Sequence, residues 1–282
     1  MQLVSDSGYD LAAQQKEGLT IHTLPLKITL NDVNYLSGVD IQSEEFYQLL
    51  EHTEGLPITS VPSPGDFINM YQKLAEDDPD ILSVHISSGL SGTYNAAVSA
   101  AAQLPDINIT LVDTLSLSAE MGWQVEAAAR AIKANWSLEK ILELLKTIRE
   151  ASEMIFTLPD LTYLIHGGRI SHLKGLLASV LGIKPVIGVD KKTGKYNDLI
   201  KVRSFKRAIQ AIPEYAAKKF KVGTLLKAQI GHAGNPEGAD QLREETNKIL
   251  NCEWLPDFTI SPVLGAHTGR GLVGLLFAPA DS

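Results

Sequence analysis

The sequence contains a single cysteine, Cys252, among 282 residues. One cysteine cannot form a disulfide within the chain, and it excludes zinc or iron–sulfur sites built from several cysteines of the same chain. The seven histidines show no His-Glu-x-x-His pattern and no other paired spacing typical of a metal site. We therefore expect a reducing compartment, most simply the cytosol, and no metal ion.

Long hydrophobic runs and an excess of basic residues are also missing. The longest apolar stretch, 176–189, is interrupted by Lys184 and Pro185 and is too short to span a bilayer. The N-terminal residues lack the basic start and the apolar core of a secretory signal. The 25 Lys and Arg residues against 33 Asp and Glu give a formal net charge of −8. This charge argues against a nucleic-acid partner, because binding to phosphates depends on clustered cations.

The remaining composition, 44% hydrophobic and 21% charged, is ordinary for a folded protein with a sizeable core. The first half alternates short β-rich runs with helical stretches, a pattern typical of parallel strands joined by crossover helices. We expect strands at 2–4, 19–30, 81–86 and 109–112, and helices that begin at Ser43 and cover 94–103, 119–134 and 138–153.

The second half has a different pattern. Residues 184–189 and 196–202 flank a turn with Gly194 and predict an antiparallel hairpin. Helices are expected at 204–220 and, after Asn235-Pro236, to about 250, with strands at 226–230, 254–260 and 271–277. The sequence thus predicts an α/β protein of two domains. Residues 1–153 would hold a mainly parallel, Rossmann-like sheet, and residues 154–282 a mixed, partly antiparallel sheet flanked by helices.

Three clusters of small polar residues stand where strands of this fold are expected to end. They are 59–64 (Thr-Ser-Val-Pro-Ser-Pro), 87–93 (Ser-Ser-Gly-Leu-Ser-Gly-Thr) and a predicted loop at 265–271 (Gly-Ala-His-Thr-Gly-Arg-Gly). Open α/β sheets bind ligands at this edge. The second cluster joins a strand to a helix, so its N–H groups and hydroxyls favour an anion. Each cluster alone is consistent with an ordinary turn or cap; together they predict a ligand site without a nucleotide motif.

In this order the clusters resemble the DegV family of bacterial fatty-acid-binding proteins, which serve as the acyl-carrying subunit of fatty acid kinase. The similarity covers nearly the whole chain. The segments that carry it are 4–7 (Val-Ser-Asp-Ser) with 10–11, 59–63, 87–94, 167–171 (Gly-Gly-Arg-Ile-Ser) and 265–269.

The resemblance implies a DegV-like fold in which a long-chain fatty acid, such as palmitate, stearate or oleate, lies in a buried tunnel, with no further cofactor. By position, Thr59 and Ser91 would contact the carboxylate. Ser60 and Ser88 would support these two residues. His267 would organise the head-group hydrogen bonds from the second domain.

Arg169 corresponds to the family's arginine near the tunnel mouth, and the resemblance implies a role in engaging the partner kinase; a helix cap or a surface ion pair is the simpler interpretation. The kinase subunit would convert the presented carboxylate to an acyl phosphate, so this chain would not be an enzyme. We also expect transient contact with a membrane surface. Arg270 stands where the family usually has proline, and would make its loop more flexible and more cationic.

Two other functions stay open. Ser91 with His267 as base would suit a serine-dependent esterase or thioesterase, with Asp113 as the third residue, although a nucleophile elbow is missing. A regulatory protein could instead dock an acidic partner on basic residues whose simpler interpretation is a solvated helix face. These residues are Lys201, Arg203, Lys206, Arg207, Lys218, Lys219 and Lys221.

Overall fold

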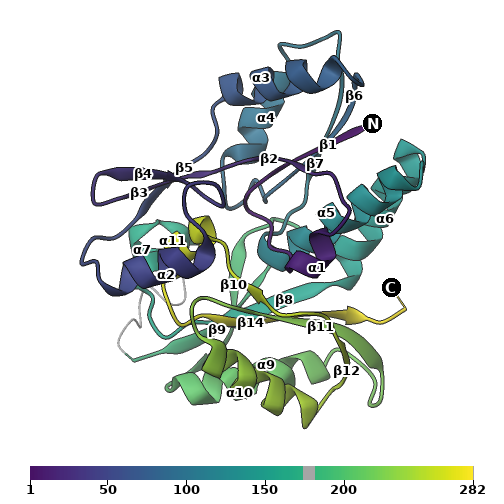
Figure 1. Cartoon of the computed structure of the whole chain (residues 1–282). Coiled ribbons are helices and arrows are strands. Elements are labelled where there is room, and N and C mark those ends of the chain that lie inside the picture. Colours follow the sequence, from purple (N-terminus) through teal and green to yellow (C-terminus); the bar gives the residue numbers. More distant parts are fainter. Residues whose placement is uncertain (174–181, 282) are drawn as a thin grey trace.

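The computed structural model describes residues 1–173 and 182–281, apart from the side chain of His172. The described chain forms three sheets with helices packed against them (Figure 1). Of the apolar stretch 176–189, residues 176–181 lie outside the described residues. Within the described ranges, no helix is long and apolar enough to cross a membrane.

The first sheet is entirely parallel, as the sequence predicts. Its strands in order are β2 (His22–Leu24), β1 (Gln2–Asp6), β6 (Asp80–His85) and β7 (Asn108–Asp113). The chain leaves β1 toward β2 on one side and continues on the other side with β6. The strand order therefore reverses between β1 and β6, which is the place where open α/β sheets bind ligands at their carboxyl edge.

Helices cover both faces of this sheet (Figure 1). Helices α3 and α4 pack on the face that carries Val4 and Ile81, whereas α5 packs on the face that carries Leu3 and Leu82. Helix α6 lies along α5, and α1 is a single turn. The bounds are α1 (Ala13–Lys16), α3 (Pro64–Ala75), α4 (Thr93–Ala101), α5 (Ser118–Lys133) and α6 (Leu138–Ala151).

A second, antiparallel sheet was not expected from the sequence. Its order is β4 (Val33–Leu36), β3 (Lys27–Leu30) and β5 (Ile58–Ser60), and α2 (Ser43–Glu51) lies between β4 and β5 in the chain. The predicted strand 19–30 is wrong in this respect, because the chain turns at Pro25 and its two halves join different sheets. Proline lacks the N–H that a continuous ladder needs at that point.

The third sheet is mixed and contains all strands from Glu153 onward. The predicted hairpin is confirmed as β9 and β10, with Gly194 at a φ of +63° in its turn. Helices α9 and α10 pack on one face, and the N-cap of α10 is Asn235, as predicted. The order is β10 (Tyr196–Val202), β9 (Lys184–Val189), β8 (Glu153–Thr157), β14 (Val273–Pro279), β11 (Leu225–His232) and β12 (Asn251–Trp254), with β13 (Phe258–Thr259) beside β11. The helices are α9 (Phe205–Ala217) and α10 (Pro236–Asn247).

Alternate residues of β8 and β14 face opposite sides of this sheet, as the two-residue period of a strand requires. Ile155 and Leu275 pack in the cluster beneath α9 and α10. Met154, Phe156 and Leu276 point the other way, into the cluster shared with α5 and the first two sheets. The second face of the large sheet therefore covers the first half of the chain.

Two sequence expectations at the end of the chain are wrong. The expected strand 254–260 is divided into β12 and β13, because Pro256 interrupts it. The expected glycine-rich loop 265–271 is largely helix α11 (Pro262–Thr268), which begins with proline in its first turn and ends at Gly269 with a φ of +68°. Proline at the start and glycine at the end are ordinary helix boundaries.

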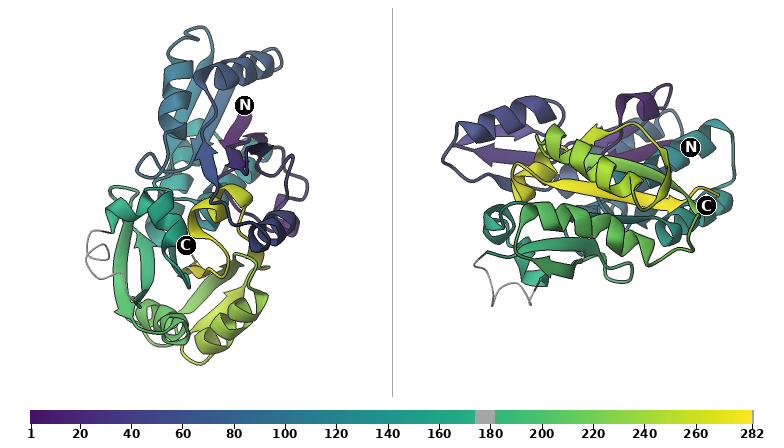
Figure 2. Two further views of the ribbon diagram at one scale, coloured as in Figure 1. Left: turned by 90° about the vertical axis from the view of Figure 1, so that its left-hand side faces the viewer. Right: turned by 90° about the horizontal axis from the view of Figure 1, so that it is seen from below.

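Helix α11 comes from the second half of the chain but packs against α2, β3 and β5 of the first half. Figure 2 shows it where the two groups of elements meet. The division into domains 1–153 and 154–282 remains a prediction. Its boundary falls at the start of β8, whose first residue is Glu153.

Asp10 connects α5 and α11 from a buried position. The Ser118 hydroxyl donates to its Oδ2 at 2.6 Å, and the Ser261 N–H donates to its Oδ1 at 3.0 Å. Burial raises the pKa of Asp10 to about 6, although these hydrogen bonds act in the opposite direction. The carboxyl group of Asp10 thus joins the two helices, and its burial makes the ionised form energetically unfavourable in the folded chain.

Replacing Asp10 by Asn should change how stability depends on pH. Because the pKa of Asp10 is higher in the folded chain than in the unfolded chain, the folded state holds the proton longer and loses stability as pH rises from 4 to 6. Relative to Asp10→Asn, the wild-type free energy of unfolding should fall by up to about 3 kcal/mol between about pH 4 and 7. Urea unfolding at both pH values measures this, and parallel pH profiles would contradict it.

Candidate functional site

Thr59 and His267, predicted from separate clusters, meet in the structure. Thr59 lies in edge strand β5 with its side chain turned inward, whereas its neighbours Ile58 and Ser60 are exposed. His267 lies in the last turn of α11. Thr59 Oγ1 is 2.7 Å from His267 Nε2, a hydrogen bond between residues 208 positions apart in the chain.

The imidazole of His267 is held in its neutral form. Burial lowers its pKa to about 3, and the charges of Arg169 and His166 act in the same direction. Nδ1 has no hydrogen-bond partner in the described part of the chain. A Cβ on Gly167 would lie 2.2 Å from Nδ1, so glycine is needed there to admit the ring. The ring is therefore available as a neutral hydrogen-bonding group with a fixed position.

Ser91 lies in the segment between β6 and α4, in contact with Thr93. The two hydroxyl oxygens are 2.9 Å apart, and the Thr93 N–H donates to Ser91 Oγ at 3.3 Å. The turn of the β9–β10 hairpin packs against this segment, since the Ser87 hydroxyl donates to the Gly194 carbonyl at 2.8 Å. A side chain on Gly89 would meet the Thr193 carbonyl at 2.4 Å. The hairpin of the large sheet thus supports the serine-rich segment of the parallel sheet.

Arg169 begins the 3-10 helix η1 (Arg169–His172), just after α7 (Thr162–His166). Its Nη1 donates to the Gly167 carbonyl at 2.6 Å. Burial lowers the pKa of the guanidinium, and no carboxylate among the described residues pairs with it. Arginine nevertheless stays protonated in proteins. Arg169 is therefore a half-buried cation without a counter-ion from the described chain.

Four of the predicted residues line one cavity of about 490 Å³: Thr59, Ser91, Arg169 and His267. The other walls of this cavity are apolar side chains and the ring of Tyr196. They are Leu26, Val61, Ile86, Leu90, Leu117, Tyr196, Val263 and Leu264. We call this space the polar cavity, because all four polar side chains come together there from different elements.

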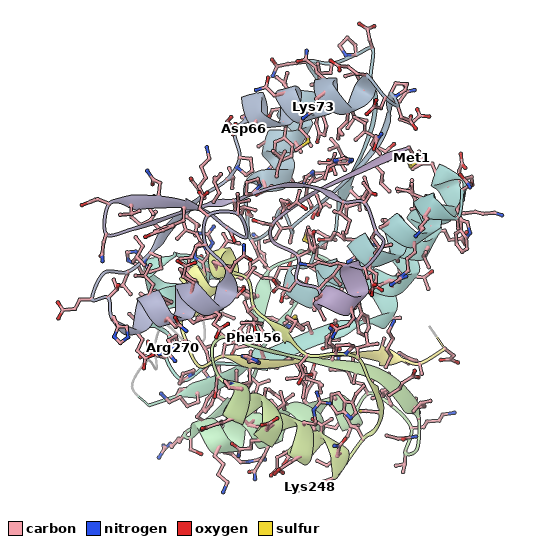
Figure 3. All side chains as sticks on the ribbon, viewed as in Figure 1. Met1, Asp66, Lys73, Phe156, Lys248 and Arg270 are labelled. Atoms are coloured by element: carbon pink, nitrogen blue, oxygen red, sulfur yellow. The ribbon has the colours of Figure 1, made fainter. Side chains whose placement is uncertain are left out.

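A second space of about 350 Å³ adjoins the polar cavity and shares Leu117, Tyr196 and Leu264 with it. We call it the apolar cavity, since aliphatic and aromatic side chains dominate its walls. Its further lining residues are Ser118, Met154, Phe156, Val189, Ile260, Thr268 and Leu272. Figure 3 shows Phe156 on the side of the large sheet that faces the first half of the chain. The two cavities together form an amphipathic site.

Sequence reasoning missed the residues that join the two cavities. Tyr196 was assigned only to a hairpin strand, yet its ring lies 5.6 Å from that of Phe156 and lines both spaces. Leu117 and Leu264 are ordinary apolar residues in the sequence. Apolar residues of this kind carry no signal of their own, because a tunnel wall and a protein core have the same composition.

Ser60 and Ser88 do not join the other four. The Ser60 side chain is exposed, on the outer side of β5, because side chains alternate along a strand. Ser88 is also exposed, and its N–H donates to Asp113 Oδ1 at 3.1 Å. Neither residue lines the polar cavity. Arg270, expected to make its loop more flexible and more cationic, forms an ion pair with Glu51 at 2.5 Å and lies beside α2 (Figure 3).

Among the residues that the structure describes, no hydrolase-like triad assembles around Ser91. Its hydroxyl pairs with Thr93, His267 pairs with Thr59, and Asp113 accepts from backbone N–H groups of the first half. A Ser83–His85–Asp6 chain of hydrogen bonds, with distances of 2.7 and 2.9 Å, does exist. All three residues are fully buried and line none of the cavities described above.

The basic stretch proposed for an acidic partner is partly neutralised. Lys201 pairs with Asp198 and Lys219 with Glu153. Arg207 makes a two-point contact with the Glu214 carboxylate, with both distances at 2.7 Å.

Among the described residues, no group of three His, Cys, Asp or Glu side chains is arranged to hold a metal ion.

Comparison with known proteins identifies the family. A family described as "Uncharacterised protein, DegV family" matches residues 1–280. The chain belongs to the DegV family. A DegV domain-containing protein of Staphylococcus aureus is 34% identical over 274 residues, 97% of either chain. The sequence resemblance is therefore confirmed.

Solved structures of DegV proteins share the fold. One, described as showing fatty acid binding of a DegV family protein from Thermus thermophilus, has a TM-score of 0.87 and 29% identity and covers 99% of each chain. Another, a stearic-acid-binding protein from Eubacterium ventriosum, has a TM-score of 0.85 and 25% identity and covers 99% of this chain and 98% of that one. The α/β architecture is thus that of the DegV family.

Histidine resonances provide a test of the site's electrostatics. Because the pKa of His267 is about 3, its ring should keep constant ¹⁵N shifts between about pH 5 and 8. Nuclear magnetic resonance of ¹⁵N-histidine-labelled protein measures this, with His267→Asn used to assign the signal. A titration of the His267 ring within that range would contradict the buried, neutral state.

Proposed function

We propose that this DegV protein binds a long-chain fatty acid, with the carboxylate in the polar cavity and the acyl chain in the apolar cavity. The observation that carries the proposal is the direct contact of the two spaces. One gathers two hydroxyls, an imidazole and a guanidinium, and the other is almost entirely hydrocarbon. The fatty acid binding described for the Thermus thermophilus and Eubacterium ventriosum proteins supports the same ligand class.

The polar cavity offers what a buried carboxylate requires. An ionised carboxylate leaves water only where donors or an opposite charge replace its hydration. The Thr59 hydroxyl, held by His267, and the Ser91 hydroxyl supply neutral donors. Arg169 supplies the positive charge and gains a counter-ion. The proposal thus assigns Arg169 to the ligand; its engagement of a kinase, expected from the resemblance, stays a prediction.

The acyl chain supplies most of the affinity in this proposal. Burying a methylene group contributes about 0.8 kcal/mol, and part of that sum offsets the entropy lost on association. The head group then fixes the orientation, with the carboxylate toward Thr59 and the methyl end toward Met154. Palmitate, stearate and oleate are the expected ligands.

The protein acts as a non-catalytic carrier in this account, in the cytosol and in transient contact with membranes. A partner kinase converts the presented carboxylate to an acyl phosphate: a carboxylate oxygen attacks the γ-phosphorus of ATP and ADP leaves. The support is the family resemblance and a polar cavity whose donors suit a phosphate as well as a carboxylate. To test this step, the protein is incubated with a kinase subunit, magnesium, ATP and radiolabelled oleate. Hydroxylamine then traps any acyl phosphate as a hydroxamate, which is measured. Hydroxamate that forms equally well without the carrier would contradict it.

Removing the hydroxyl donors should weaken binding of the fatty acid. Thr59→Val and Ser91→Ala each delete a donor beside the carboxylate while keeping the site nearly the same size. We expect each dissociation constant to rise about 5- to 150-fold, equivalent to about 1–3 kcal/mol. Titration of delipidated protein with oleate measures the change.

Ser60→Ala and Ser88→Ala are the matched controls, because both serines are exposed and lie outside the polar cavity. Their dissociation constants should stay within about twofold of the wild-type value. Equal losses in all four variants would show that the polar cavity is not the carboxylate site.

The charge of Arg169 should matter for acids and not for neutral lipids. Arg169→Gln keeps a polar side chain but removes the cation, so oleate binding should weaken at least about tenfold. Binding of oleyl alcohol, which has the same chain and no charge, should change little. Equal losses for the acid and the alcohol would argue that Arg169 acts only through packing.

A further inference from the structure

A groove lies beyond the methyl end of the proposed ligand. It has a volume of about 670 Å³ and is bordered by α5, α6 and the ends of β11 and β14. Trp123, Leu144 and Ile148 supply apolar surface, whereas Glu126, Arg130 and Lys227 are charged. The head group of the proposed ligand would lie at the opposite end of the apolar cavity, so this groove is a separate space.

The groove continues the apolar cavity along the same elements. At the start of α5, the N-cap Leu117 and the first residue Ser118 line the apolar cavity, and the groove begins at Trp123 further along the helix. On the large sheet, Phe156 and Met154 line the apolar cavity, and Ser152, just before β8, lines the groove. Residues 152 and 156 are separated by roughly 13 Å of extended chain. Both walls thus run from one space into the other.

The side chains of Met154 and Leu276 separate the two spaces on the sheet side. They form a cross-strand pair between β8 and β14 on the face of the apolar cavity, and both are buried. The Met154 methyl carbon lies 3.5 Å from the position a Cβ on Gly274 would occupy, beside Phe156. The Met154 side chain therefore points along the sheet toward Phe156, where it forms part of the wall of the apolar cavity.

Beyond Met154 the walls become polar. The Ser152 hydroxyl donates to the buried Glu120 carboxylate at 3.3 Å, and Lys191 forms an ion pair with the same carboxylate. A methyl end that passed this point would contact polar side chains and gain little from burial. An unbranched methionine with three rotatable side-chain bonds is also easily displaced or shortened.

We infer that Met154 sets the upper limit of acyl chain length in this protein. The inference rests on the proposed fatty-acid function and adds the residue that selects among ligands. In the wild-type protein, affinity should rise by about fourfold for each added methylene until the chain reaches Met154, and then stop rising. Shortening this side chain frees apolar space at the end of the cavity, so the rise continues for longer chains until the methyl end reaches the polar walls beyond.

Met154→Ala tests the inference in a competition experiment. Delipidated protein is incubated with an equimolar mixture of saturated fatty acids of about 12 to 22 carbons, and the bound lipids are identified by mass spectrometry. The most abundant bound acid should lengthen by about two carbons in Met154→Ala, because three side-chain heavy atoms have been removed. Met154→Val, a milder truncation, should give a smaller shift in the same direction and serves if the alanine variant does not fold.

Ile155→Ala is the matched control. Ile155 is the next residue of β8 and fully buried, but it faces α9 on the opposite side of the sheet. Its truncation should lower stability and leave the chain-length distribution unchanged. If both Met154 variants bind fatty acids with the wild-type distribution, or if Ile155→Ala lengthens it equally, the inference is wrong and the proposed function stands. If the wild-type protein binds no acid of any length, both fail.

Discussion

The site depends on the position of α11, a seven-residue helix from the end of the chain that is held by the first half. Its N-terminal end is fixed by hydrogen bonds to the Asp10 carboxylate and the Ser37 hydroxyl. Its last turn carries His267, which meets Thr59 of the small sheet. These contacts bring together segments that are far apart in the sequence, and the polar cavity exists only where they meet.

The separation of polar and apolar walls accounts for the proposed function. The carboxylate needs replacement donors and a charge in a small volume, whereas the acyl chain needs only hydrocarbon contact. Tyr196 borders both volumes and comes from the hairpin whose turn supports the serine-rich segment. In the proposed function, one hairpin therefore both contacts the acyl chain and supports the segment that would hold the head group. The sheet face that carries Phe156 and Met154 would then direct the acyl chain of the proposed ligand away from the polar cavity.

Much of the fold follows from local patterns. The parallel strands, the β9–β10 hairpin and the Asn235 cap were predicted because periodicity and turn residues act over a few positions. The small sheet and α11 were not, although Pro25, Pro262 and Gly269 mark their boundaries in the sequence. The pairing of Thr59 with His267 could not be read from spacing, since it depends on tertiary packing; the family resemblance suggested that the two act together. The position of Arg169 inside the cavity and the role of Tyr196 needed the structure.

The central claim is that the protein as purified holds a fatty acid in this amphipathic site. Native mass spectrometry of the intact chain, followed by denaturation and identification of the released lipid, tests it without assuming a partner. The account predicts one fatty acid per chain, lost or reduced when Thr59 and Arg169 are replaced together. A chain that is empty as purified and that takes up no added fatty acid after delipidation would contradict it.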